Sequence, residues 1–276
     1  MQGLHSILLH TINFTGEVQK LMYTEIIELV KSTKKIVFDK QKQHDISMKG
    51  AADFVTAVDM AISDFLKEEL AKLTPEIGFM SEEEKAEIQP VRWILDPIDG
   101  TTNLVYGYNK SSVSLALCEN EVITFGVIFD PFTDELFVAE RGKGAYYNGE
   151  KISVADDRDL ENCIVEFGAG STKKQYADIS FAMAKEVFLN CLDLRRICSS
   201  ALSVSYAAQG RINGYFEYQI KPWDYAAASL IFEECGGILT DWHGEKLPFD
   251  RPSSIVCGTP KMHKFLLETV QKYNEK

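Results

Sequence analysis

Apolar residues recur at helical spacing in two stretches near the start of the chain. The first stretch contains Val18, Leu21, Met22, Ile26, Leu29 and Val30, and the second contains Ile62, Phe65, Leu66, Leu70 and Leu73. An apolar side chain at every third or fourth position indicates an amphipathic helix. The second stretch stops before Pro75, whose ring cannot continue a helix. We therefore expect the first 75 residues to be mainly helical.

From about Ile77 the pattern changes to short apolar runs that are typical of β-strands. These runs are RWILD, SSVSLALCE, EVITFGVIFD and ELFVAER. DPFTD forms one short connection between them, and Asn148-Gly149 is a dipeptide that favours a tight hairpin turn. The runs predict a meandering sheet.

After about residue 155, predicted strands and helices alternate. The expected strands are CIVEF, LDLRRI, GYFEY, GGILTD and SSIVCG, and the expected helices lie at residues 176–189 and 201–209, from Asp224 onward, and at the C-terminus. The helix from Asp224 ends on a glycine pair that suits a left-handed stop. Alternation implies layered α/β packing. We expect residues 1–154 and 155–276 to be two halves of one continuous fold, because no linker or repeat separates them.

Composition excludes several classes of function. A formal net charge of −12 over 276 residues argues against gripping nucleic acid, whose phosphates attract basic patches. No apolar run reaches the roughly 18 residues of a membrane span, and the first residues lack the basic segment and cleavage site of a signal peptide. The six cysteines form no CxxC pair, so we expect them to be reduced and mostly buried. These features predict a soluble cytoplasmic protein without nucleic-acid or membrane partners.

The segment WILDPIDGTTN, residues 93–103, ends an apolar run with two aspartates three positions apart. A turn explains each residue singly, because Asp-Pro and Asp-Gly both favour chain reversal. A turn at Pro97 after a strand ending at Asp96 would also bring Asp99 to the same side. Two carboxylates about 4 Å apart repel by ~4 kcal/mol in a partly buried site. The pair therefore needs a shared proton or a cation.

Neighbouring residues favour a divalent cation beside a phosphate group. Hard oxygen donors surround the pair, and no histidine or thiol is close in sequence, so Mg²⁺ is the natural ion and Mn²⁺ a possible substitute. Gly100 lets the backbone approach a ligand, and residues 101–103 have the character of a helix start, whose free amides bind phosphate oxygens. This combination indicates metal-assisted transfer of a phosphoryl group to water.

Four segments, in the same order, resemble the inositol monophosphatase superfamily of Mg²⁺-dependent, Li⁺-sensitive phosphatases. They are DFVTAVD at residues 53–59, SEE at residues 81–83, the central DPIDGTTN motif, and PWDYAAA at residues 222–228. The resemblance implies an αβαβα sandwich of the α+β or α/β class. It also implies hydrolysis of a small-molecule phosphomonoester, with inositol monophosphate favoured as substrate, in a protein that is commonly a homodimer.

The resemblance assigns roles to individual residues. It implies two or three Mg²⁺ ions held by Glu82, Asp96, the Ile98 carbonyl, Asp99 and Asp224. Glu82 and Thr101, the latter polarised through Asp59, would orient the attacking water. The implied substrate contacts are Gly100, Thr101, Lys49, Arg196, Ser199, Ser200, Ala201 and Glu217.

Several of these residues also have an ordinary structural interpretation. Glu82 lies in a charged run typical of a solvated surface, and Glu217 could be a charge at a strand end. Asp59 and Asp224 could each cap a helix, and an N-cap carboxylate at Asp224 would still leave one oxygen for a metal. Ser199 stands where relatives frequently have glycine, so the width of the substrate pocket is open.

Other functions remain compatible with the same residues. The substrate could be fructose 1,6-bisphosphate, NADP or another sugar or nucleotide phosphate. A protein of a different class, which binds metal and phosphate for regulation without turnover, would keep the metal ligands. The presence of Glu82, Asp59 and Thr101, which handle the water, favours an enzyme.

Overall fold

The computed structural model describes residues 16–39, 46–50, 53–84, 87–170 and 174–274. Its larger sheet has seven strands in the order β3-β4-β5-β6-β7-β8-β9. They are β3 (Gly78–Ser81), β4 (Val91–Asp99), β5 (Ser112–Glu119), β6 (Val122–Asp130), β7 (Glu135–Glu140), β8 (Gly144–Tyr147) and β9 (Glu150–Ile152). From β4 to β9 all pairs are antiparallel, which confirms the predicted meander. β3 is an addition that runs parallel to β4, and its four residues are too few to show a period.

The second sheet has five strands in the order β11-β10-β12-β14-β13. They are β10 (Ile164–Phe167), β11 (Asp193–Arg195), β12 (Gly214–Ile220), β13 (Ile238–Thr240) and β14 (Ser253–Gly258). β10 is parallel to both β11 and β12, whereas β14 is antiparallel to β12 and β13. The five strands predicted after residue 155 are therefore confirmed as one sheet.

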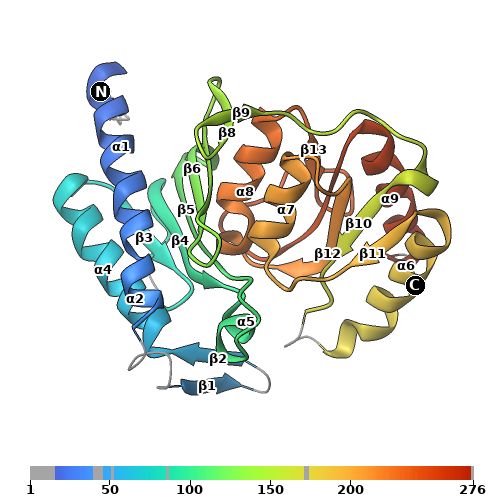
Figure 1. Cartoon of the computed structure of the whole chain (residues 1–276), viewed down its shortest axis with the longest axis horizontal. Coiled ribbons are helices and arrows are strands. Elements are labelled where there is room, and N and C mark those ends of the chain that lie inside the picture. Colours follow the sequence, from blue (N-terminus) through green and yellow to red (C-terminus); the bar gives the residue numbers. More distant parts are fainter. Residues whose placement is uncertain (1–15, 40–45, 51–52, 85–86, 171–173, 275–276) are drawn as a thin grey trace, which may run out of the picture.

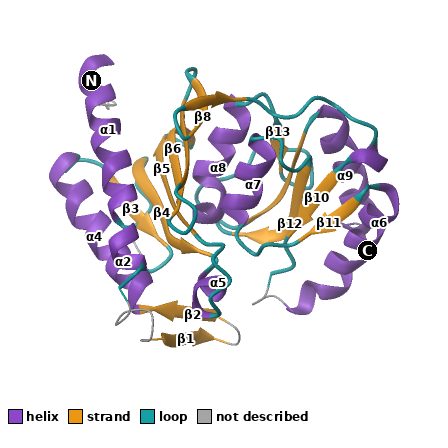
Figure 2. Ribbon diagram, in the orientation of Figure 1, coloured by secondary structure: helices purple, strands orange, loops and turns teal. Residues whose placement is uncertain are grey.

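Helices form three layers around the two sheets (Figures 1 and 2). The outer layer on the larger sheet has α1 (Gly16–Ser32), α2 (Lys34–Val37) and α4 (Ala57–Leu73), the middle layer has α7 (Ser200–Ala208) and α8 (Pro222–Glu234), and the far layer has α6 (Ala177–Asn190) and α9 (Pro260–Asn274). The order is that of the expected αβαβα sandwich. Two short 3₁₀ helices, Leu160–Asn162 and Lys174–Tyr176, lie in connections.

The expectation of a mainly helical start was incomplete. Two short strands, β1 (Ile46–Gly50) and β2 (Asp53–Thr56), pair with each other between α2 and α4. Their apolar residues are few and lie directly before a helix, so the sequence offers little alternation to detect. The hairpin lies beneath the short helix α5 (Thr101–Val105), near the end of β4 (Figure 1).

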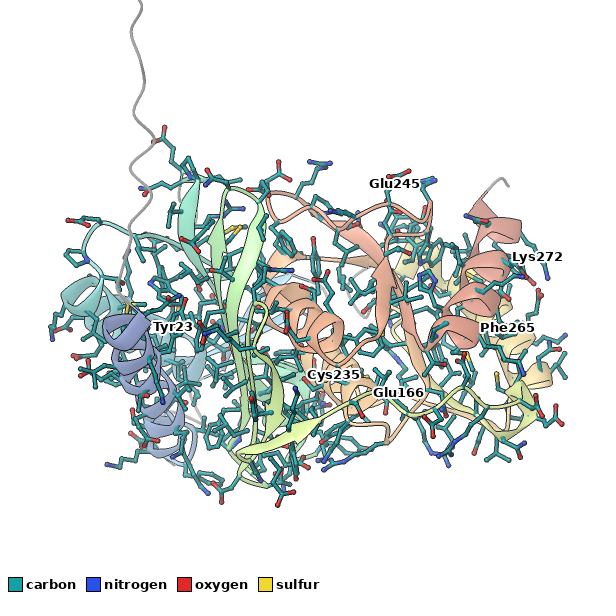
Figure 3. All side chains as sticks on the ribbon, turned by 90° about the horizontal axis from the view of Figure 1, so that it is seen from above. Tyr23, Glu166, Cys235, Glu245, Phe265 and Lys272 are labelled. Carbon is teal, nitrogen blue, oxygen red and sulfur yellow. The ribbon has the colours of Figure 1, made fainter. Side chains whose placement is uncertain are left out.

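Side chains fill the spaces between the layers. In Figure 3, Tyr23 lies at the α1 end of the molecule, and Phe265 and Lys272 lie at the α9 end. Tyr23 stacks on Phe125 of β6 with ring centroids 4.1 Å apart, and Phe232 of α8 is buried in the middle layer.

Five of the six free cysteines are buried, as expected. Among the described residues, no helix is long and apolar enough to cross a bilayer. A division of the chain at about residue 154 stays a prediction.

Close contact between β6 and α8 fixes the middle layer against the larger sheet. A methyl group added at Gly126 would lie 2.9 Å from the backbone oxygen of Ala227. Backbone atoms cannot move aside as a flexible side chain can, so any larger residue at this position would push α8 away from β6.

We expect Gly126→Ala to lower the free energy of unfolding by about 1–3 kcal/mol, the usual cost of overpacking a core. Urea denaturation followed by circular dichroism measures the change. An unchanged denaturation midpoint would show that α8 does not depend on this contact.

Candidate functional site

A β-bulge places Asp96 and Asp99 on the same side of the larger sheet. In a regular strand, residues three apart face opposite sides. Here Asp96 pairs with Ser114 and Asp99 pairs with Ser112, so β4 has one more residue than β5 over the same interval. The expected turn at Pro97 is thus a bulge within β4, which proline tolerates because a bulge leaves a residue unpaired.

Glu82 reaches the same region from the neighbouring strand. β3 is parallel to β4 with Ser81 opposite Leu95, and the Glu82 amide donates to the Leu95 carbonyl at 3.3 Å. Glu82 follows Ser81, and Asp96 follows Leu95, so the two acidic residues hold equivalent positions, Glu82 directly after β3 and Asp96 within β4. Burial is the largest cause of the raised pKa of Asp96, and the negative charge of Glu82 is the second largest.

The first turn of α7 holds Asp99. The Ser199 hydroxyl and the Ala201 amide donate to Asp99 Oδ2 at 2.5 and 2.8 Å, and the Ser200 amide donates to Oδ1 at 3.3 Å. An anion at a helix N-terminus is stabilised by the free amides and by the helix dipole. These bonds orient a carboxylate that a metal could bind, as second-shell donors do in metal sites.

Asp224 joins from the start of α8. Its Oδ2 accepts a hydrogen bond from the Lys221 amide at 2.7 Å. Lys221 is the N-cap and Asp224 is the third helical residue, so the prediction of Asp224 as the N-cap was wrong by three positions. Pro222 suits the first helical position, so the helix starts earlier in the chain than predicted. The functional expectation is unaffected, because Oδ1 does not take part in this bond.

One candidate metal site lies among the described residues. Asp96, Asp99 and Asp224 each offer a carboxylate oxygen, and these atoms lie within 4.8 Å of one another. Burial raises the pKa of all three groups, that of Asp99 to about 6, and their mutual repulsion adds to the shifts of Asp96 and Asp224. A divalent cation would relieve both penalties. The donors are all hard oxygens, which fits Mg²⁺.

Thr101 and Asp59 lie beside this cluster in a hydrogen-bonded chain. The Thr101 hydroxyl is 3.1 Å from Asp59 Oδ1 and 3.0 Å from the Ile98 carbonyl oxygen, so either oxygen can accept its proton. Asp59 Oδ2 accepts from the Thr56 amide and hydroxyl. The Thr56 hydroxyl accepts from the Val58 and Asp59 amides, so Thr56 is the cap of α4 and the prediction of Asp59 as the cap was wrong by three positions. Burial raises the pKa of Asp59 to about 6.

Gly100 connects the two aspartates to α5 through a backbone that other residues would strain. Its φ is +93°, and an added methyl group would lie 3.0 Å from the Lys110 carbonyl oxygen and 3.2 Å from that of Cys198. The glycine therefore lets the chain turn into α5 while two other segments press against it.

A cavity of about 240 Å³ opens beside the cluster. Glu82, Asp99 and Asp224 line it toward the cluster, and Arg196, Ser200 and Glu217 line it elsewhere. Glu217 Oε2 accepts from the hydroxyls of Tyr215 and Ser200 at 2.5 and 3.1 Å, and Oε1 accepts from the Gly170 amide at 3.1 Å. The cavity therefore joins the carboxylate cluster to a second set of hydrogen-bonding groups.

The remaining predicted residues are placed less simply. Ser199 and Ala201 are buried and contact Asp99, and neither lines this cavity, so their place in the substrate pocket stays a prediction. Gly100 and Thr101 begin α5 outside the lining of this cavity. Lys49 lies in β1, but its side chain is outside the described residues.

The backbone conformation that favours glycine occurs at Cys198, and not at Ser199, where a side chain was expected in place of glycine. Cys198 has φ of +61°, in the left-handed region that favours glycine, whereas Ser199 is extended with φ of −136°. The exposed Cys198, rather than Ser199, therefore adds a side chain to the cavity.

Tyr215 and Lys221 are among the cavity residues that sequence reasoning missed. Tyr215 lies two positions before Glu217 on β12, so the strand period alone would have placed both on one face. Lys221 directly precedes the PWD segment and lines the cavity beside Asp224.

Comparisons with known proteins agree with this arrangement. Residues 11–275 match the model of the inositol monophosphatase family. Over 230 residues the chain is 36% identical to the protein named Nus factor SuhB of Escherichia coli, covering 82% of this chain and 86% of that protein. It is 35% identical over 244 residues to the inositol-1-monophosphatase of Rhizobium meliloti, covering 85% and 89%.

A solved structure shares the whole architecture. The Thermotoga maritima IMPase superposes with a TM-score of 0.84 at 29% sequence identity, covering 93% of this chain and 98% of that one.

We expect Mg²⁺ to raise the unfolding temperature more at pH 7.5 than at pH 5. Carboxylates with a raised pKa in the folded state bind more protons than in the unfolded chain, so the free energy of unfolding falls as pH rises from about 4 to about 6. Mg²⁺ binds the ionised form and reverses this loss. Scanning fluorimetry with EDTA or Mg²⁺ at both pH values tests it. An equal Mg²⁺ effect at the two pH values would contradict the clustered site.

Proposed function

Because the chain belongs to the inositol monophosphatase family, we propose that it is a Mg²⁺-dependent phosphatase that hydrolyses inositol monophosphate or a related small phosphomonoester. The observation that carries the proposal is the convergence of Asp96, Asp99 and Asp224 on one point, with oxygens within 4.8 Å of one another. Two separate segments of chain supply these carboxylates beside a cavity large enough for a small ligand.

We propose that Glu82, Asp96, Asp99, Asp224 and the Ile98 carbonyl hold two or three Mg²⁺ ions. When bound, such ions lower the pKa of a water molecule and offset the charge that develops on the leaving oxygen. Asp99 is oriented for this role by α7, and Asp224 by the Lys221 amide. Mn²⁺ would serve the same oxygen donors.

Thr101 and Glu82 would orient the attacking water. If the Thr101 hydroxyl donates to Asp59, its lone pairs are free to accept a hydrogen bond from that water. Glu82 would accept a hydrogen bond from the other O–H of the water. The amides of Gly100 and Thr101, at the start of α5, would stabilise the phosphoryl oxygens in the transition state.

The far end of the cavity would bind the alcohol portion of the substrate. Glu217 can accept from a substrate hydroxyl, and its bonds to Tyr215, Ser200 and Gly170 fix its position. Arg196 and Ser200 also line this end. A polyol such as inositol suits these groups, and fructose 1,6-bisphosphate and NADP are the alternatives to compare with it.

A regulatory role without turnover is the alternative from another class. The relatives named Nus factor SuhB are about a third identical to this chain, for example 36% for the Escherichia coli protein. Thr101 and Asp59 support the enzyme, because a protein that only bound metal and phosphate would not require a polarised hydroxyl beside the cluster.

We also propose that the protein is a cytoplasmic homodimer. Free cysteines fit a reducing compartment. Exposed apolar side chains on and after α6 offer a surface for a second copy, namely Phe181, Phe188, Leu189 and Leu192.

Light scattering should give twice the mass of the chain, and Phe188→Glu should shift the measured mass toward that of the monomer. A wild-type monomer would refute the dimer.

We expect Asp99→Asn to abolish phosphate release, with a fall in kcat of at least about a hundredfold. The change removes a ligand charge while it keeps the size of the side chain. Release of inorganic phosphate from inositol 1-phosphate, fructose 1,6-bisphosphate and NADP in the presence of Mg²⁺ measures activity and ranks substrates.

Circular dichroism provides the control that Asp99→Asn is folded. A folded variant with normal Mg²⁺-dependent turnover would remove Asp99 from the metal ligands. A wild-type protein that releases phosphate from no phosphomonoester in a wide panel would favour the regulatory alternative.

A further inference from the structure

Lys221 places a positive charge at the edge of the carboxylate cluster. Its Nζ lies 3.9 Å from Glu82 Oε1, and it lines the same cavity as Glu82, Asp99 and Asp224. The expected roles of the family motif did not include this residue.

Two features hold the ammonium group at this position. The Lys221 backbone caps α8, with its amide bonded to Asp224 and its carbonyl accepting from the Asp224 amide at 3.0 Å. The ammonium lies 5.1 Å from the centroid of the Trp223 ring, a distance that allows a cation–π interaction. The position of Lys221 is thus fixed by the same helix start that supplies a metal ligand.

The positive charge of Lys221 repels a cation bound next to Glu82 more strongly than a cation bound deeper in the cluster, next to Asp96 and Asp99. A divalent ion bound by Glu82 would lie within a few ångströms of the ammonium, and like charges at that distance repel. The Asp96 and Asp99 side chains are buried, whereas Glu82 and Lys221 are 21% and 43% exposed. The repulsion is therefore screened by water but not removed.

A phosphate group in the cavity would reverse this opposition. Its negative charge attracts both the ammonium and the divalent ion, and a lysine binds phosphate through charge-assisted hydrogen bonds. We infer that Lys221 is a built-in counter-charge that weakens metal binding on the Glu82 side until phosphate enters the site. The inference rests on the proposed function, because it concerns the same site and the same phosphate ligand.

Isothermal titration with Mg²⁺ alone, in the absence of substrate, tests the first half of the inference. Lys221→Met keeps a long apolar side chain but has no charge. In this variant we expect the dissociation constant of the weaker Mg²⁺ site to fall about fivefold. Lys221→Gln should show the same direction. Lys221→Arg keeps the charge and should resemble the wild type.

Inorganic phosphate tests the second half. With Mg²⁺ at saturation, we expect Lys221→Met to bind phosphate about fivefold more weakly. Tighter metal and weaker phosphate are opposite effects of one substitution, which general damage to the site would not produce. Lys72→Met is a matched control, because Lys72 is an exposed lysine that pairs with Glu68 and Glu69 on α4.

The results separate this inference from the proposed function. A wild-type enzyme that hydrolyses phosphomonoesters, with unchanged or weaker Mg²⁺ binding in Lys221→Met and Lys221→Gln, would overturn the role of Lys221 alone. Tighter Mg²⁺ binding in these variants of a protein without turnover would overturn the phosphatase and leave the counter-charge in place.

Discussion

Repulsion among carboxylates that the backbone holds together is the interaction on which this structure depends. Asp96, Asp99 and Asp224 would separate if they were free to move, because burial and mutual charge both disfavour their ionised forms. Each instead accepts at least one backbone N–H, from Ile98, from the first turn of α7 or from Lys221. The fold therefore supplies the geometry, and the divalent cation proposed for this site would supply the charge that offsets the repulsion.

The layered architecture explains how distant parts of the chain meet at this point. The bulge in β4 and the parallel strand β3 bring acidic residues to one end of the larger sheet. The middle layer brings the starts of α7 and α8 to the same end. Close contact of Gly126 with Ala227 limits the distance between sheet and helix, so a packing constraint in the core also affects the spacing of the carboxylates.

Local chemistry in the sequence predicted most of the elements and the acidic cluster, but not the contacts between elements. Asp-Pro-Ile-Asp indicates two carboxylates on one side whether it forms a turn or a bulge, so the conclusion survived the wrong choice between them. The bonds from Ser199 and Ala201 to Asp99 join positions about a hundred residues apart, and no local pattern encodes them. The four residues of β3 were missed because a parallel partner, rather than a period, defines that strand.

The docking of Asp99 onto α7 also has a consequence for the order in which the carboxylate cluster forms. Residues 1–154 contain Glu82, Asp96 and Asp99, but the helix that orients Asp99 and the last carboxylate, Asp224, come only from later in the chain. A nascent chain in which only the first part has folded thus has an incomplete site. A divalent cation bound there as proposed would consequently meet its full set of carboxylates only after these contacts of high sequence separation have closed.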